Sequence, residues 1–155
     1  MKEVVFDTET DGLAYDCTKM HILSYTYDGK EVISVGGYKE MVEFFSQEDT
    51  LFIAHNSVPF DMVVVNRILG LDMSYKKFVD TLAVSWFLEP NRKKHGLGSY
   101  TKASGVEKPQ IDDWQDISWE AAKHRCESDV KINWWLWQQQ RSRLKEIYDA
   151  KPTRK

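Results

Sequence analysis

Long apolar runs are missing from this sequence, and none approaches the roughly 20 residues that a membrane-spanning helix requires. The first residues, Met1-Lys2-Glu3, also lack the pattern of a secretory signal. Cysteine is scarce, because Cys17 and Cys126 are the only two and have no CxxC spacing, which indicates no disulfide framework. These absences predict a protein of the reducing cytoplasm that makes no contact with a membrane.

An excess of positive charge is missing too, since the formal net charge is -3. A protein that coats long duplex DNA is usually basic, so the sequence disfavours that class. An enzyme that holds only a few nucleotides through metal ions needs no broad basic surface, and the charge does not exclude it. The sequence also has no internal repeat and no low-complexity segment.

The sequence does contain enough apolar material for one globular domain. Its 155 residues are 42% hydrophobic and 13% aromatic, which is typical of a packed domain and not of a disordered chain. We expect a single domain over residues 1–150 and a short basic tail over residues 151–155.

Hydrophobic patterning and turn signals predict alternating strands and helices. The expected strands cover residues 2–7, 20–27, 31–35, 50–54 and, at an edge, 77–79. The expected helices cover residues 39–46, 59–69, 81–88, 96–103 and 119–148. The first three strands follow one another and are predicted to be antiparallel, and the whole order is that of an α/β domain with a mixed sheet.

Two acids end the first strand, in the run Val4-Val5-Phe6-Asp7-Thr8-Glu9. Side chains alternate along a strand, so Asp7 and Glu9 point to the same face. Two neighbouring carboxylates repel each other and lose hydration, which a divalent metal such as Mg²⁺ or Mn²⁺ would offset. The alternative is a strand that simply runs into a polar turn at Asp11-Gly12.

A third acid, Asp61, stands near the start of the helix expected over residues 59–69. It continues an apolar stripe with Val64, Val65 and Ile68, where an acid costs energy unless it is paired or ligated. The alternative is a first-turn acid that interacts only with the helix dipole.

A fourth acid, Asp129, shares a face of the last helix with Ile132, Asn133 and Leu136. It again lies on an otherwise inward stripe, which favours a buried partner or a metal. The alternative is an ion pair with Arg125, one helical turn earlier, which would contribute about 0.3 to 0.5 kcal/mol.

Together these acids form the pattern FDTET, then HN-x4-D, then H-x4-D, which is more specific than any of its parts. The pattern resembles the DnaQ-like, or DEDD, 3′-5′ exonucleases, which have a ribonuclease H-like fold. Asp7 and Glu9 match the first motif of that family, Asp61 the second and Asp129 the third. His124, five residues before Asp129, has the spacing of the histidine (DEDDh) subgroup.

Over residues 4–137 the chain is most similar to the proofreading domains of phage-type family A DNA polymerases. The similarity is carried by TKMH at 18–21, DTL at 80–82 and HGLGSY at 95–100. Those domains usually have a tyrosine four residues before the last acid, whereas this chain has Arg125 there and His124 one position earlier. In a regular helix His124 lies about 140° around from Asp129, so it reaches the metals only if the helix bends or frays or if His124 moves.

The resemblance implies a ribonuclease H-like α/β fold, with a mixed five-stranded sheet in which three antiparallel strands precede shorter ones, flanked by helices. It implies two Mg²⁺ or Mn²⁺ ions held by Asp7, Glu9, Asp61 and Asp129, with Asp7 bridging them. His124 would accept the proton of the attacking water. The reaction would be hydrolysis at 3′ ends of single-stranded DNA that releases nucleoside 5′-monophosphates, in replication or repair.

Four further residues are expected to contact substrate. Thr8 and Thr10 flank the first acids, Leu13 would pack on the terminal base, and Asn56 would hydrogen-bond substrate or orient an acid. The structural alternatives are a helix cap for Asn56 and loop packing for Leu13. A basic loop at residues 92–95 would steer phosphates or remain solvated. Asp80 and Ser118 are each predicted to cap the helix that follows.

The expected partners are single-stranded DNA 3′ ends, possible RNA ends, and a separately encoded DNA polymerase, with the protein itself a monomer. A phage source would place it in the host cytoplasm. Two other functions stay open: an exoribonuclease similar to oligoribonuclease, and a non-catalytic exonuclease-like module that binds a replication complex. The presence of all four acids argues against the second.

Overall fold

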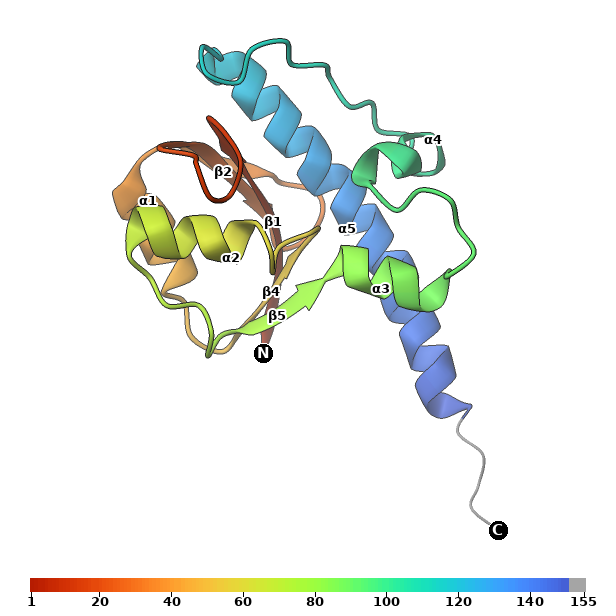
Figure 1. The fold of residues 1–155 in the computed structure, drawn as a ribbon. Coiled ribbons are helices and arrows are strands. Elements are labelled where there is room, and N and C mark those ends of the chain that lie inside the picture. Colours follow the sequence, from red (N-terminus) through yellow and green to blue (C-terminus); the bar gives the residue numbers. More distant parts are fainter. Residues whose placement is uncertain (151–155) are drawn as a thin grey trace.

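The computed structural model describes residues 1–150, and the expected basic tail at 151–155 lies outside the described residues. A five-stranded mixed sheet with the order β3-β2-β1-β4-β5 forms the centre of the molecule (Figure 1). Its strands are β1 (Lys2–Thr10), β2 (Met20–Thr26), β3 (Ile33–Val35), β4 (Thr50–Ala54) and β5 (Lys77–Asp80). The first three pair antiparallel, as predicted, and β4 and β5 add in parallel.

Helices cover both faces of the sheet (Figure 1). They are α1 (Tyr38–Phe45), α2 (Asp61–Val64), α3 (Thr81–Leu88), α4 (Thr101–Ser104) and α5 (Trp119–Asp149). A π-helical turn (Val65–Leu69) continues α2, and a 3-10 turn (Leu97–Tyr100) leads into α4. The predicted mixed five-stranded α/β fold is therefore confirmed.

Strand β1 separates two apolar clusters, and its alternation decides which residue enters which. Val4 and Phe6 point toward α1 and α2, where Phe6 meets Phe44 and Phe45 edge to face. Val5 points to the other face and packs near Val130 of α5. The same alternation continues into the polar end of the strand, so Asp7 and Glu9 follow Val5 onto the α5 face while Thr8 follows Phe6.

Strand β1 is three residues longer than predicted, because pairing with β2 continues through the acids. Asp7 lies opposite Ser24 and Glu9 opposite Ile22, and the register shifts only between Glu9 and Thr10. Backbone hydrogen bonds outweigh the low strand propensity of the acids here. The shift after Glu9 is an irregularity of the kind that often re-aims side chains beside functional sites.

Two of the three predicted helix caps are confirmed. The Asp80 side chain accepts from the backbone N–H of Leu82 at the start of α3, and the Ser118 hydroxyl accepts from Ala121 at the start of α5. The third was wrong: α2 begins only at Asp61, with Phe60 before it and no side-chain cap. Asn56 instead has a left-handed backbone, φ +63°, and donates its N–H to Asp80 Oδ1 at 2.9 Å.

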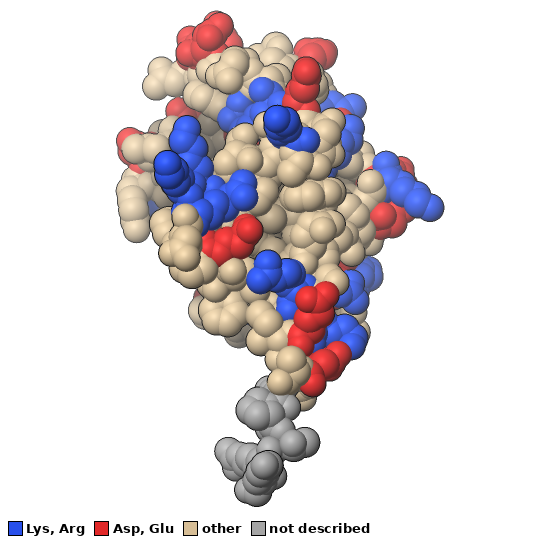
Figure 2. All heavy atoms as spheres, turned by 90° about the vertical axis from the view of Figure 1, so that its right-hand side faces the viewer, with Lys and Arg blue, Asp and Glu red and all other residues tan. Residues whose placement is uncertain are grey.

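Strand β5 is the predicted edge strand, and the segment between α4 and α5 is irregular, as predicted. Within residues 1–150, none of the helices combines the length and the apolarity that crossing a membrane would take. On the face formed by the right-hand side of Figure 1, Lys and Arg side chains surround a largely uncharged centre (Figure 2).

Candidate active site

The end of β1 places two carboxylates against α5. Asp7 and Glu9 are both partly buried and share the face that α5 covers. The Cys126 thiol of α5, itself fully buried, donates to the backbone O of Asp7 at 3.2 Å and lies 3.5 Å from its Oδ2. Ligand atoms of Asp7, Glu9 and Cys126 lie within 4.8 Å of one another. The first motif and α5 therefore form one cluster.

Asp129 reaches the same cluster from α5, where it is buried. Two cations approach it: Lys108 Nζ lies 3.0 Å from Oδ1, and Arg125 Nε lies 3.5 Å from Oδ2. The predicted Arg125 ion pair thus exists, but it coexists with proximity to the other acids, since the Asp129 charge raises the pKa of both Asp7 and Glu9. The two interpretations of Asp129 are not exclusive.

Asp61 approaches from the opposite face of β1. It is the first residue of α2 and is 3% exposed, and its Oδ1 accepts a 2.5 Å hydrogen bond from the Thr8 hydroxyl. Its charge also raises the pKa of Asp7, so the carboxylates are close enough to interact. The fold brings all four predicted acids to the end of β1, three of them on the α5 face and Asp61 on the α2 face.

Burial dominates the electrostatics of these carboxylates. Burial, then repulsion from Glu9, Asp129 and Asp61, holds the pKa of Asp7 well above its ordinary value. Burial followed by the Asp129 charge raises the pKa of Glu9 to about 8, against the lowering effect of Arg125 and Lys108. Burial raises the pKa of Asp61 to about 7. Ionising the cluster is thus costly without more positive charge nearby.

The donor set fits divalent metal ions. Carboxylate oxygens are the hard ligands that Mg²⁺ and Mn²⁺ prefer. Among the described residues, Asp7 and Glu9 have ligand atoms within 4.8 Å of each other, and the charges of Asp61 and Asp129 act on Asp7 from nearby. Among residues 1–150, Asp129 Oδ1 is buried and has no hydrogen-bond partner, although Lys108 lies close. A buried anionic oxygen of this kind is expected to have a ligand or an ion.

The structure places His124 on the exposed surface of α5. The helix is continuous from Trp119 to Asp149, and the His124 carbonyl accepts from the Ser128 hydroxyl at 2.7 Å, so the helix does not fray there. Of the conditions set by the sequence, a bend of the helix and movement of His124 remain. Its role as proton acceptor stays a prediction.

A hollow of about 400 Å³ opens beside Glu9. It is lined by Thr10, Leu13, Phe60 and Trp114, among others, and the Leu13 side chain is 72% exposed. An apolar hollow next to carboxylates offers stacking surface for a base. The hydroxyls of both threonines have partners within the protein, because that of Thr8 donates to Asp61 and that of Thr10 to the backbone O of Gly12. Contact of Thr10 and Leu13 with a terminal nucleotide stays a prediction.

Other predicted substrate contacts lie elsewhere. Asn56 is exposed but helps to hold the loop before α2 against Asp80. In the basic loop, His95 is buried against Ser85, and the Arg92 guanidinium lies 4.1 Å from the centre of the Tyr100 ring. Half of that loop is thus structural, and steering of phosphates by residues 92–95 remains a prediction for the exposed members.

Sequence reasoning missed three residues of the site. Cys126 had a detectable signal, because it lies three positions before Asp129 on the same inward stripe. Lys108 and Trp114 had none, since they belong to the irregular segment between α4 and α5. That segment is fixed to β2 by a 2.8 Å hydrogen bond between His21 Nε2 and the Trp114 backbone O.

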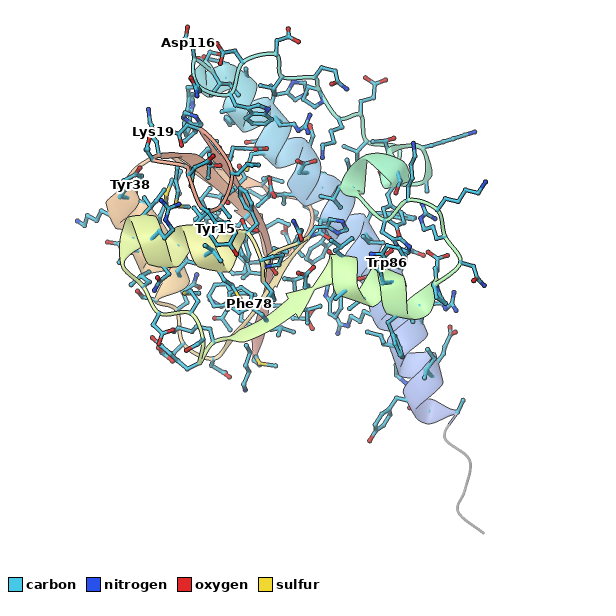
Figure 3. All side chains as sticks on the ribbon, viewed as in Figure 1. Tyr15, Lys19, Tyr38, Phe78, Trp86 and Asp116 are labelled. Atoms are coloured by element: carbon cyan, nitrogen blue, oxygen red, sulfur yellow. The ribbon has the colours of Figure 1, made fainter. Side chains whose placement is uncertain are left out.

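Figure 3 draws the side chains on the ribbon, including those at the end of the molecule where α5 begins. Lys19, just before β2, and Asp116, just before α5, both lie at the upper end, where the irregular segment returns to the helix. The loop after β1 and the segment before α5 lie next to each other, because residues of both line the hollow beside Glu9.

No protein-family model matches this sequence, and no curated protein does. Solved structures do match its fold. NrnC of Brucella melitensis superposes with a TM-score of 0.76 and 20% identity over 97% of this chain and 77% of that one. Other NrnC structures contain bound Mg²⁺ or pGG.

Two Escherichia coli nucleases also match. Exonuclease I in complex with a dT13 oligonucleotide has a TM-score of 0.66 at 15% identity, over 96% of this chain and 42% of that one. RNase D, an exoribonuclease involved in structured RNA processing, has a TM-score of 0.63 at 12% identity, over 99% and 46%. The likeness found is to these nucleases, and the closer similarity to polymerase proofreading domains stays a prediction. At such identities the comparison establishes the fold alone: this chain has the ribonuclease H-like fold that these nucleases share.

Proposed function

We propose that this chain is a metal-dependent 3′-5′ exonuclease that removes nucleoside 5′-monophosphates from the 3′ ends of single-stranded DNA. The observation that carries the proposal is the convergence of Asp7, Glu9, Asp61 and Asp129 at the end of β1. The nuclease fold and the solved neighbours with Mg²⁺ and with oligonucleotides support it.

The four acids would hold two Mg²⁺ or Mn²⁺ ions. When bound, such a pair stabilises the attacking and leaving oxygens of an in-line phosphoryl displacement. The protein supplies the rest: Cys126 fixes the Asp7 backbone and side chain, and Thr8 fixes Asp61 from the other face. Rigidly held carboxylates keep the geometry that such a displacement needs.

His124 is proposed to take the proton of the attacking water after its side chain turns toward the acids. An imidazole is the side chain that most often exchanges protons near neutral pH. His124 is exposed and lies about 140° around the continuous helix from Asp129, so this role requires His124 to move when substrate binds.

The terminal nucleotide is proposed to enter the hollow beside Glu9. Leu13, Phe60 and Trp114 line this hollow and offer an apolar surface to the base. Thr10 lies at the same hollow, and Asn56 is proposed to contact the strand only if the loop before α2 moves. Contact with single strands suits this small footprint and the net charge of -3.

The direct test is degradation of a 5′-labelled single-stranded DNA oligomer in Mg²⁺. We expect a ladder of shortened products, with nucleoside 5′-monophosphates in the soluble fraction, and no ladder in EDTA. A 3′-labelled copy separates 3′-5′ from 5′-3′ cleavage. Full-length DNA after prolonged incubation in both Mg²⁺ and Mn²⁺ would contradict the proposal and favour a non-catalytic binding module.

A second candidate is a 3′-5′ exoribonuclease that acts on short RNA. The structural match to NrnC, which was solved with bound pGG, covers 97% of this chain and favours this alternative. Matched DNA and RNA oligomers of two, five and twenty nucleotides in direct competition would decide it. Faster loss of the RNA series, with the greatest preference for the dimer, would replace DNA as the proposed substrate.

A separately encoded DNA polymerase remains a proposed partner, and a monomer remains the proposed state. Both rest on the resemblance and can be tested by size-exclusion chromatography of the protein alone and with a polymerase.

A further inference from the structure

The strongest unexplained feature of the molecule is a lysine inside the acid cluster. Lys108 belongs to the irregular segment between α4 and α5, and its side chain is only 21% exposed. Its Nζ lies 3.0 Å from Asp129 Oδ1. Burial raises the pKa of Asp7 and Glu9, and the Lys108 charge opposes that rise, so Lys108 also interacts with these two acids.

Lys108 is held there by its neighbours in the chain. Arg125 of α5 donates from its guanidinium to the backbone O of Pro109, the next residue after Lys108. The same guanidinium lies 5.6 Å from the centre of the Trp114 ring, and the Trp114 backbone O is tied to His21. The position of Lys108 is therefore built into the fold and is not that of a solvated lysine which happens to be near.

The contact is a charge pair without a hydrogen bond. Within residues 1–150, Asp129 Oδ1 has no hydrogen-bond partner of good geometry even though Lys108 Nζ is 3.0 Å away. A structural ion pair in a protein interior is expected to be hydrogen-bonded, because desolvation otherwise exceeds the attraction. A cation that balances charge without saturating the oxygen leaves that oxygen available to a metal.

Beyond Lys108 the surface opens. Lys108, Arg125 and Gln110 line a hollow of about 540 Å³, which gives the lysine side chain space outside the cluster. A flexible four-carbon stem can move its ammonium group by several ångströms without moving the backbone. The segment can therefore keep its contacts while Lys108 leaves Asp129.

We propose that Lys108 is a resident counter-ion of the acid cluster that competes with the divalent metal for Asp129 and turns into the neighbouring hollow when metal binds. This inference rests on the proposed metal site. It assigns Lys108 a positioning role: it keeps the carboxylates together in the metal-free protein and sets the metal concentration at which the site is loaded.

The first experiment measures Mn²⁺ affinity of the full chain by calorimetry at about 0.15 M salt, with Lys108→Gln against the wild type. Removing a competing cation should tighten binding by about fivefold to tenfold. Lys108→Arg keeps the charge and should stay within about twofold. Lys131→Gln removes the same charge from an exposed position two residues from Asp129 and should change little. Unchanged or weaker Mn²⁺ binding in Lys108→Gln would overturn the proposal.

The second experiment needs no variant, so it stands even if Lys108→Gln fails to fold. An amine-acylating reagent is applied to the wild-type protein with and without Mn²⁺, and mass spectrometry follows modification of each lysine. Acylation of Lys108 should rise severalfold with Mn²⁺, while that of Lys131 stays constant. Equal labelling of Lys108 in both conditions would refute its release.

These readouts separate this inference from the proposed exonuclease activity. Tighter Mn²⁺ binding in Lys108→Gln, combined with no hydrolysis of any oligomer, would support the counter-ion and refute the enzyme. Hydrolysis by the wild type, combined with unaltered Mn²⁺ affinity in Lys108→Gln, would support the enzyme and refute the counter-ion.

Discussion

The two faces of β1 solve the same problem, a buried carboxylate, in opposite ways. On the α2 face, Asp61 accepts a 2.5 Å hydrogen bond from a neutral hydroxyl, that of Thr8. On the α5 face, Asp7, Glu9 and Asp129 lie together, and Lys108 and Arg125 supply positive charge. One face stabilises a single acid through a hydrogen bond, and the other tolerates several acids only through cations.

The difference shows where a metal contributes most. A hydrogen-bonded acid such as Asp61 is locally satisfied, whereas a group of acids keeps a mutual repulsion that only added positive charge removes. Disturbing the α5 face should therefore change both metal binding and activity, while disturbing the α2 face should chiefly change geometry.

The largest effect is expected from Asp7→Asn, which keeps the shape of the side chain but removes the central charge of the α5 face. Loss of a metal ligand should reduce kcat by at least about 10³-fold. The same change should stabilise the metal-free protein to thermal unfolding, because it relieves repulsion. Asp72→Asn, at an exposed acid in a turn, is the matched control and should keep full activity. Near-normal cleavage by Asp7→Asn would show that metal binding does not depend on the acids of the α5 face.

The next effect concerns the pH dependence of stability without metal. The pKa of Glu9 is raised to about 8 and that of Asp61 to about 7, so the folded state keeps protons that the unfolded state releases above about pH 4 to 5. The contribution of these two groups to stability should therefore be greatest below about pH 4 and fall as the pH rises toward 8, by an amount on the order of several kcal/mol.

Thermal unfolding in EDTA from pH 5 to pH 8 measures that slope, and Mn²⁺ should flatten it because bound metal favours the ionised carboxylates. A stability that rises over this range in EDTA would show that Lys108 and Arg125 already neutralise the cluster.

A smaller effect on rate is expected from His124→Ala, because the metal site stays intact. Loss of a proton acceptor typically costs about 10²-fold in kcat. The pH profile of the rate should also differ between the wild type and the variant, because the variant lacks the imidazole. A variant with the wild-type pH profile and rate would assign the proton to another group.

The smallest effect is expected from Thr8→Val, which removes the hydroxyl that holds Asp61 and leaves the α5 face unchanged. We expect a loss of about tenfold in kcat and about 1 to 2 kcal/mol in the free energy of unfolding. Thr50→Val also loses a buried hydroxyl hydrogen bond, to the backbone O of Glu48, but lies at the far end of β4. Thr50→Val should lose as much stability as Thr8→Val but keep the wild-type kcat. Equal kcat values in both variants would show that the hydrogen bond from Thr8 does not position Asp61 for catalysis.

The sequence predicted most of the framework because its signals are local. Alternation placed Asp7 and Glu9 on one face, the i, i+3 and i, i+4 stripe placed Asp129 inward, and Asp80 and Ser118 capped the helices as expected. The start of α2 was wrong, because Asn56 is drawn to Asp80, a contact 24 residues away that no local pattern encodes.

By itself the sequence determined which positions are acidic and on which face of its strand or helix each one lies. It could do so because periods of 2 and 3.6 residues are properties of the local chain. Only the tertiary structure decided what surrounds those acids. It put Asp61 across β1 from the other three, brought the Cys126 thiol to Asp7, and set Lys108 against Asp129. Those contacts depend on where an irregular segment and a long helix pack on the sheet, and packing between distant segments leaves no periodic trace in the sequence.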